Sequence, residues 1–395
     1  MLAQLSSRSA PLARRRLAAP ALALAMLALP AAAGAQEAAS WELKKSSDDV
    51  AAATAAGIAD AARDGGKVEA PTGKKIGLLL LSGQSPANQR VVSAAQDIAG
   101  MFGYEVIVCD PNFDPQKVAQ CATSLVAQQP DAIMSTSQSA LALGASLTDA
   151  ADAGIPWFSL IAGVDPHPAL IPYGITGREI GKVYDAWLFD EIKKKKGGDG
   201  PAKVMALGAP ALGLALLAQQ EQLLEDAKTA GVDVTVLHDL DLPNVVQDTL
   251  STAKQTITQH PDLGGTWTVC DFCVPLIAQA FDTEGLTGDD RPVVGGNYTM
   301  PQTADLLRAG KVDGVVDVPF EASVYVAFDQ LLQSWAREKA INKDPAVFTD
   351  GYALTFMEPY MVTKDNIGDG AIPIFGADYE DYFHAKWKEE FGVGG

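Results

Sequence analysis

Long apolar stretches are absent from the chain after its N-terminus, and histidine, cysteine and aromatic residues are scarce. Of the 395 residues, 4 are histidine and 4 are cysteine, while Phe, Trp and Tyr together make up 7%. The one later apolar stretch, 204–218, is interrupted by Gly208, Pro210 and Gly213, so it predicts a buried strand followed by the start of a helix. Without an uninterrupted apolar stretch of membrane-spanning length in this part of the chain, we expect no stable membrane insertion.

Sequence motifs of common enzyme classes are missing as well. The histidines stand in no recognisable triad setting, and there is no H-E-x-x-H, no G-x-x-x-x-G-K-[ST], and no G-x-G-x-x-G after the first predicted strand. Residues 83–87, GQSPA, imitate the G-x-S-x-G elbow of hydrolases but lack its final glycine. The sequence therefore indicates a protein that is not an enzyme, with no catalytic residue, no cofactor and no metal site.

Basic residues are outnumbered by acidic ones, 30 against 49, which gives a formal net charge of −19. Four of the basic residues lie within the first 35 positions, so the rest of the chain is still more acidic. Such a charge repels phosphate backbones and anionic lipid surfaces. We therefore expect no nucleic-acid partner.

The first 35 residues carry the pattern of a secretory signal peptide. Arginines at 14–16 precede an apolar stretch over 17–29, and Ala33-Gly34-Ala35 forms an A-x-A cleavage site. The apolar stretch is shorter than the ~20 residues that a spanning helix needs, which argues against a membrane anchor. The arginines and the two residues after them match a twin-arginine export motif only loosely. No cysteine near the cleavage site could carry a lipid. We predict a soluble periplasmic chain that begins near Gln36.

One pattern repeats along the remaining chain: a short β-rich run, a turn, and then a helical pattern. This alternation predicts parallel sheets with helices on both faces, that is, an α/β fold. The predicted strands are 75–81, 104–110, 132–135, 156–161, 203–208, 232–238, 266–269, 292–296 and 314–318. The predicted helices include 86–102, 115–129, 137–153, 178–194, 211–230, 245–260 and 320–340.

The alternation breaks once, between the strand that ends at 161 and the strand that begins at 203, where prolines at 166, 168 and 172 precede Gly174. Two similar Rossmann-like lobes, joined by a hinge of several crossings, are therefore expected, and such lobes can close around a ligand. The predicted division is a signal peptide 1–35, an N-terminal extension and linker 36–72, lobe 1 over 73–174, lobe 2 over 175–316, a return to lobe 1 over 317–340, and a C-terminal tail 341–395.

Several segments, in their order and spacing, are similar to one known family. They include KIGLLLLSGQSPANQRVVSAAQDIAGMFGYEV, AGIPWFSLIAG, WTVCDFCVPLIAQAF and VDGVVDVPFEASVYVAFDQL. Over roughly residues 74–340 the sequence resembles the type I periplasmic binding proteins, in the ribose-binding-like branch that shares its fold with LacI-type repressors. The resemblance implies the solute-binding component of an ABC importer, with a small-molecule ligand and a membrane permease as partners. The alternative is a ligand-binding partner of a chemoreceptor or histidine kinase.

The resemblance also implies where a ligand binds, because family members hold it at the carboxyl ends of the strands of both lobes. The alternative for each polar position is a residue that caps a helix or turn, as Ser, Asn and Asp often do. The implied contacts from the first lobe are Gln84, Ser85, Asn88, Ser137, Trp157, Phe158 and Ser159, and those from the second lobe and the hinge are Asp271, Phe272, Asn297 and Asp317.

Two departures from the sugar binders of this branch concern the ligand. Where relatives stack aromatic residues on a sugar ring, this chain has Ala87-Asn88, and where they have an Asp-Arg pair it has Ile161-Ala162. Each buried sugar hydroxyl needs a hydrogen-bond partner, so we expect a ligand less polar than ribose. The competing hypothesis is that other residues of this chain have taken over the binding of a sugar. Aromatic residues such as Trp157, Trp267, Phe272 and Phe320 either contact such a ligand or belong to the core.

The four cysteines form two pairs that are close in sequence, Cys109 with Cys121 and Cys270 with Cys273. An even number in an oxidising compartment favours disulfides, and a bridge over a loop as short as the first is worth roughly 3 kcal/mol. The second pair has the C-x-x-C spacing of a redox motif at a helix start. We favour a structural bridge near the ligand cleft over a catalytic one, because the rest of the redox signature is missing.

Overall fold

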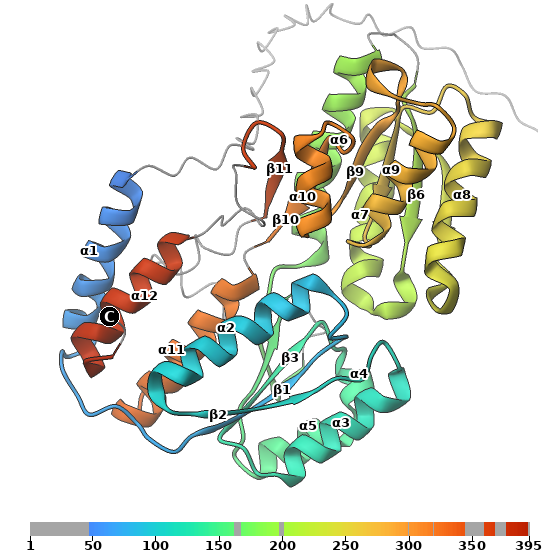
Figure 1. Ribbon diagram of the computed structural model, residues 1–395. Coiled ribbons are helices and arrows are strands. Elements are labelled where there is room, and N and C mark those ends of the chain that lie inside the picture. Colours follow the sequence, from blue (N-terminus) through green and yellow to red (C-terminus); the bar gives the residue numbers. More distant parts are fainter. Residues whose placement is uncertain are drawn as a thin grey trace, which may run out of the picture. The chain divides into compact units, whose positions relative to one another are not determined.

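The computed structural model describes residues 47–161, 167–196, 201–298, 300–318, 320–343, 359–367 and 377–393. The predicted signal peptide and its cleavage site, together with Ala162, lie outside these residues. Two separate β-sheets with helices packed on them form the described part, and Figure 1 shows both. None of the described helices combines the length and the apolar character needed to cross a bilayer.

The first sheet is fully parallel, with strand order β2-β1-β3-β4-β5. Its strands are β1 (Lys75–Leu79), β2 (Glu105–Cys109), β3 (Ala132–Thr136), β4 (Trp157–Leu160) and β5 (Leu170–Tyr173). The helices between them are α2 (Pro86–Phe102), α3 (Pro115–Ala127), α4 (Ala140–Leu143) and α5 (Ala145–Asp152).

Local sequence signals fix the ends of these helices. A proline at the first helical position starts both α2 and α3, where its missing N–H costs nothing. The Asp114 side chain accepts hydrogen bonds from the first backbone N–H groups of α3, and Gly103 ends α2 with a left-handed φ of 69°. These signals bring the chain from each strand back over the sheet and leave the loops at the strand ends.

The second sheet has the order β11-β10-β9-β8-β6-β7 and repeats the order of the first once β11 is left out. Its strands are β6 (Lys203–Gly208), β7 (Asp233–Asp239), β8 (Gly265–Thr268), β9 (Val293–Asn297), β10 (Gly314–Asp317) and β11 (Tyr360–Thr363). Only β11 is antiparallel to its neighbour. The helices are α6 (Gly177–Lys196), α7 (Leu214–Ala230), α8 (Val245–Gln259), α9 (Cys273–Thr283) and α10 (Pro301–Arg308), with short 3-10 turns at Pro210–Leu212, Leu242–Asn244 and Gly288–Asp290.

The predicted fold class, two α/β lobes with mostly parallel sheets, is confirmed. Two strands were not predicted, β5 and β11. Strand β5 contains Pro172, but it is an edge strand, where a missing N–H is tolerated. The helix predicted over 137–153 is broken at Gly144, whose φ of 55° separates α4 from α5.

Alternating side chains cover both faces of the first sheet. Ile76 and Leu78 belong to a large cluster that also contains residues of α2, whereas Leu79, Ile133 and Trp157 belong to a second cluster with residues of α3 and α5. The central strands β1, β3 and β4 are therefore buried on both faces, as parallel sheets require.

The chain after β10 visits both sheets. Helix α11 (Phe320–Arg337) packs against α2, β4 and β5, next to the first sheet. Strand β11 then pairs with β10 of the second sheet, and the last helix, α12 (Ala377–Phe391), packs against α11 and against α1 (Ser47–Arg63). Residues near both ends of the chain thus form one helix pair, visible beside α11 in Figure 1.

One buried acid makes a testable contribution to stability. Asp185 of α6 is fully buried and accepts a hydrogen bond of 2.8 Å from Trp267 Nε1. Burial, and then repulsion by Asp226, raise the pKa of Asp185 well above its usual value. The folded state therefore holds this proton more tightly than the unfolded state, so the free energy of unfolding falls as pH rises above about 4.

Replacing Asp185 by asparagine is expected to raise the free energy of unfolding at pH 8 by about 1 to 3 kcal/mol, since no buried charge then has to form. Denaturant unfolding at pH 5 and pH 8 measures this, and the gain should be larger at pH 8. Asp190→Asn, on the exposed side of the same helix, is the control. An equal effect of both substitutions, or a loss of stability in Asp185→Asn, would contradict the expectation.

Candidate ligand-binding site

A cavity of about 660 Å³ lies where the carboxyl ends of strands from both sheets meet. From the first sheet, residues that follow β1, β2, β3 and β4 line it, such as Gln84, Phe113 and Ser137. From the second sheet, residues that follow β6, β7, β8 and β9 line it, such as Leu212 and Asp271. This is the position at which open α/β sheets bind their ligands.

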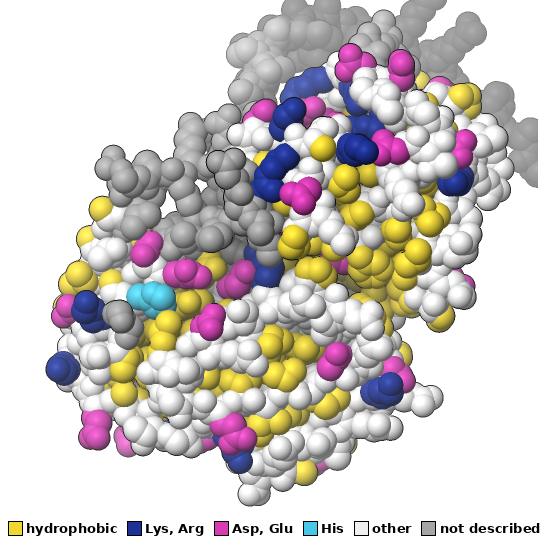
Figure 2. All heavy atoms as spheres, in the orientation of Figure 1, with side chains coloured by type: hydrophobic (Ala, Val, Ile, Leu, Met, Phe, Trp, Pro, Cys, Tyr) yellow, Lys and Arg dark blue, Asp and Glu magenta, His cyan; other side chains and the backbone are white. Residues whose placement is uncertain are grey.

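The cavity wall is mostly apolar. Figure 2 shows hydrophobic side chains gathered on the visible face over the region of α7, α8 and α9. Among the described residues that line the cavity there is no Lys, Arg or His. The polar side chains in the wall are Gln84, Ser85, Asn88, Asn112, Asp114, Ser137, Asp271 and Tyr298, and the larger apolar ones include Leu81, Phe113, Ile161, Leu212, Leu216, Leu240, Leu242, Val245, Val246, Val269, Phe272 and Met300.

Ser85 and Asp271 bring the two lobes together at this cavity. Ser85 Oγ donates to Asp271 Oδ2 at 3.4 Å, and the Phe272 backbone N–H donates to Asp271 Oδ1 at 2.8 Å. Although Ser85 precedes α2, its side chain does not cap that helix. Burial raises the pKa of Asp271 to about 6 despite these two hydrogen bonds. Both side chains line the cavity, and their contact with a ligand remains a prediction.

Gln84 and Asn88 line the cavity and also hold its loops. Asn88 Oδ1 accepts from the Leu81 backbone N–H at 3.1 Å and from Thr136 Oγ1, which ties the loop after β1 to β3. Gln84 Nε2 donates to Asn112 Oδ1 at 2.7 Å and so joins the loops after β1 and β2. In this structure the hydrogen bonds of Gln84 and Asn88 hold the loops that form the cavity wall.

Three predicted contacts of β4 lie in the core and outside the cavity lining. Trp157 belongs to the cluster beneath α3 and α5 and donates from Nε1 to Ser135 Oγ at 3.0 Å. Phe158 packs on Tyr173, with ring centroids 5.1 Å apart, and Ser159 is 1% exposed. Because β4 is a central strand covered on both faces, its own side chains point into the two clusters.

The predicted ligand contacts at the ends of β9 and β10 do not line the cavity, and both form hydrogen bonds with other side chains. Asn297 forms a pair of amide hydrogen bonds with Gln219, at 2.9 and 3.0 Å. Asp317 accepts from Arg90 at 2.9 Å. Ligand contacts by these two residues remain predictions.

Of the aromatic candidates, only Phe272 lines the cavity. Trp267 is fully buried and stacks on Tyr184 with ring centroids 5.8 Å apart, while Phe320 is 1% exposed and lies under the Arg90 guanidinium. Both belong to the large core cluster, which was the alternative stated for them.

A family model described as a periplasmic binding protein domain matches residues 76–339 of this sequence. The chain belongs to that family. No curated protein matches the chain.

Several solved structures share the type I periplasmic binding fold with this chain. Their sequence identities to it are low, so the likeness concerns the fold and not the ligand. An ABC sugar transporter subunit from Rhodobacter sphaeroides 2.4.1 is 19% identical with a TM-score of 0.61, covering 75% of this chain and 99% of that one. A carbohydrate transporter solute-binding protein from Agrobacterium Radiobacter, in complex with D-arabinose, is 19% identical with a TM-score of 0.63, covering 77% and 99%. A periplasmic ribose ABC transporter from Conexibacter woesei DSM 14684 is 18% identical with a TM-score of 0.60, covering 77% and 95%.

In this periplasmic binding protein a large part of the cavity wall comes from the segments that follow β2, β6 and β7, none of which was among the predicted ligand contacts. They contribute Asn112 and Phe113 from the loop after β2, Leu242 from the 3-10 turn after β7, and Leu216 and Val246 from the first turns of α7 and α8. Asn112 and Phe113 have left-handed φ angles of 53° and 61°. The strand-end rule, applied to every predicted strand and not only to the positions carried over from relatives, would have found these loops.

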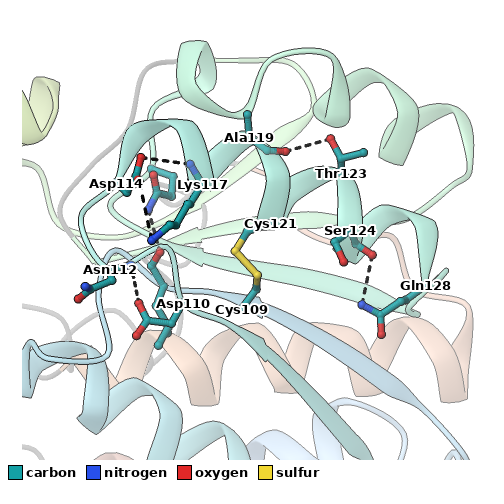
Figure 3. The surroundings of a disulfide bond; sticks show 12 residues. Cys109, Asp110, Asn112, Asp114, Lys117, Ala119, Cys121, Thr123, Ser124 and Gln128 are labelled. Carbon is teal, nitrogen blue, oxygen red and sulfur yellow. Dashed lines mark hydrogen bonds and ion pairs between the residues drawn. A yellow bond between two sulfur atoms is a disulfide. The ribbon is translucent and has the colours of Figure 1, made fainter.

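Each lobe of the periplasmic binding protein carries one disulfide beside a lining loop. Cys109–Cys121 joins the end of β2 to α3 and so brackets the loop with Asn112 and Asp114, as Figure 3 shows. Cys270–Cys273 joins the end of β8 to the start of α9 and encloses Asp271 and Phe272. Both bridges limit the movement of residues that line the cavity.

Proposed function

We propose that this chain is the solute-binding component of an ABC importer and holds one small organic molecule, less polar than a monosaccharide, between its two lobes. The observation that carries the proposal is the cavity at the strand ends of both sheets, with its mostly apolar wall. Burying apolar ligand surface against such a wall is worth roughly 25 cal/mol per Å². The few polar groups then fix the orientation of the ligand.

The proposed mechanism is closure about the crossings between the lobes. A ligand that touches Ser85 in one lobe and Asp271 in the other stabilises the closed state more than the open state, which is what drives closure. The closed form would then dock on the permease. Membership of a periplasmic family supports a periplasmic location, which the predicted cleavage near Gln36 would deliver.

The alternative to an apolar ligand is a sugar of the kind named for solved relatives, and a test must distinguish the two. Those structures include complexes with D-arabinose and D-allose. A pyranose has several hydroxyl groups, and each one buried without a partner costs about 1 to 3 kcal/mol. Of the polar side chains in the cavity wall, Gln84, Asn88, Asn112 and Asp114 already form hydrogen bonds within the chain, so sugars are poorly matched to it.

We expect ribose, arabinose, glucose and allose to leave the melting temperature of the purified protein unchanged, whereas apolar compounds with one polar group raise it. A ligand at 100 times its Kd adds about 2.7 kcal/mol of stability, enough for a clear shift. Titration calorimetry of each hit measures the affinity. Micromolar binding of a free monosaccharide, without any response to apolar compounds, would refute the proposed ligand class.

A further inference from the structure

Two carboxyl groups line the cavity among the described residues, and their surroundings differ. Asp114 caps α3, accepting from the backbone N–H groups of Gln116 and Lys117, and its Oδ2 lies 3.8 Å from Lys117 Nζ. Asp271 is 6% exposed and accepts hydrogen bonds from the Ser85 hydroxyl and the Phe272 N–H. It forms no ion pair with any residue that the structure describes, so within this part of the chain it is a buried acid without a cationic partner.

The buried guanidinium of Arg90 is already paired with two other carboxylates. Asp317 and Glu321 bind the buried guanidinium of Arg90, at 2.9 and 2.5 Å. An isolated buried carboxylate is costly unless something pairs with it. Burial raises the pKa of Asp271 only to about 6, so the group still carries its charge at neutral pH. The missing partner can come from the ligand.

We propose that the cavity takes an apolar molecule with one positively charged nitrogen, whose N–H groups bind the Asp271 carboxylate. This inference rests on the proposed function, since it needs a ligand between the lobes. The apolar body of the molecule lies against side chains such as Phe113, Leu216, Leu242 and Met300. Hydrogen bonds between an ammonium group and a carboxylate are about twice as strong as neutral ones.

The same wall excludes anions. No Lys, Arg or His stands among the described lining residues to receive a carboxylate or phosphate, and Asp271 and Asp114 both repel one. Ser85 and Ser137 can each meet a single hydroxyl or N–H group, so a neutral alcohol fits less well than an amine but better than an acid. The expected order of affinity is amine, alcohol, carboxylate.

The test compares the three head groups on fixed carbon skeletons by titration calorimetry at pH 7.5. The first series is tryptamine, tryptophol and indole-3-acetate, and the second carries the same head groups on adamantane. On at least one skeleton, the amine should bind about tenfold or more tightly than the alcohol, a difference of about 1.4 kcal/mol, and the carboxylate should not bind.

Two variants assign this preference to one side chain. Asp271→Asn keeps the size of the side chain and the acceptor for the Phe272 N–H. This variant should bind the amine at least tenfold more weakly than the native protein does, whereas its affinity for the alcohol should change by no more than about threefold. Asp305→Asn removes the same charge from an exposed position of α10 and should keep the full preference for the amine. If Asp271→Asn does not fold, the order of the head groups on the native protein decides.

The outcomes separate this inference from the proposed function. If alcohol or carboxylate binds as tightly as the amine, or if Asp271→Asn keeps the preference, the charged-nitrogen inference is wrong while the apolar ligand stands. If no head group binds on either skeleton, both are contradicted. Binding of a monosaccharide in place of all six probes would refute both the charged-nitrogen inference and the proposed apolar ligand class.

Discussion

Replacing Lys386 by methionine is expected to lower the free energy of unfolding by about 3 to 5 kcal/mol, because the change removes the cation that pairs with the buried carboxylate of Asp329. Lys386 of α12 is 2% exposed, and its Nζ lies 2.7 Å from Asp329 of α11, 2.9 Å from Asp64 and 3.4 Å from Glu390. The same carboxylate of Asp329 also accepts from Trp387 Nε1 at 2.9 Å. One ammonium group thus joins α12, α11 and the end of the α1 segment.

Denaturant unfolding of Lys386→Met beside Lys388→Met measures this effect, because Lys388 is exposed on the same helix. Lys388→Met should change stability by less than about 0.5 kcal/mol. Adding Asp329→Asn to Lys386→Met should recover part of the loss, since the buried carboxylate that lost its cation is then replaced by a neutral amide. Equal effects of the two lysine substitutions would show that the buried cluster does not fasten α12.

The α1–α12 pair also marks the limit of what the sequence could predict. Local periodicity and turn signals placed the main strands and helices, and α2 begins at Pro86 and ends before Gly103 as predicted, because proline and glycine mark both ends. The contact between α1 and α12 joins residues more than 300 positions apart. No local pattern encodes such a contact, and it lies outside the family match at 76–339.

The candidate site was predictable to a similar degree. Ser85 and Asp271 were placed at strand ends, and the parallel sheets bring both to the cavity. Whether a strand-end residue faces the cavity or another side chain depends on its long-range partner. Asn297 is bonded to Gln219 and Asp317 to Arg90, and neither partner was visible in the sequence. Strand alternation likewise could not decide which face of β4 is open, because both are covered.

The second large effect is expected at Arg90, which fastens the crossing from the second sheet to the first. Arg90 lies on α2, whose N-terminal turn lines the cavity, and its guanidinium donates to Asp317 at the end of β10, to the Val318 carbonyl, and to both carboxylate oxygens of Glu321 on α11. The side chain of Asp317 is 0% exposed. The guanidinium of Arg90 therefore neutralises a fully buried carboxylate.

We therefore expect Arg90→Met to lower the free energy of unfolding by about 3 to 5 kcal/mol, and Arg90→Lys to lower it less. A lysine keeps the charge but cannot donate to Asp317 and Glu321 in the geometry of the planar fork. Arg178→Met is the matched control, because Arg178 forms an exposed pair with Glu221 at 2.8 Å and should contribute no more than about 1 kcal/mol. Denaturant unfolding of the three variants measures these differences. A loss in Arg90→Met no larger than that in Arg178→Met would mean that the crossing is held by packing of α11 on α2 and not by the buried charges.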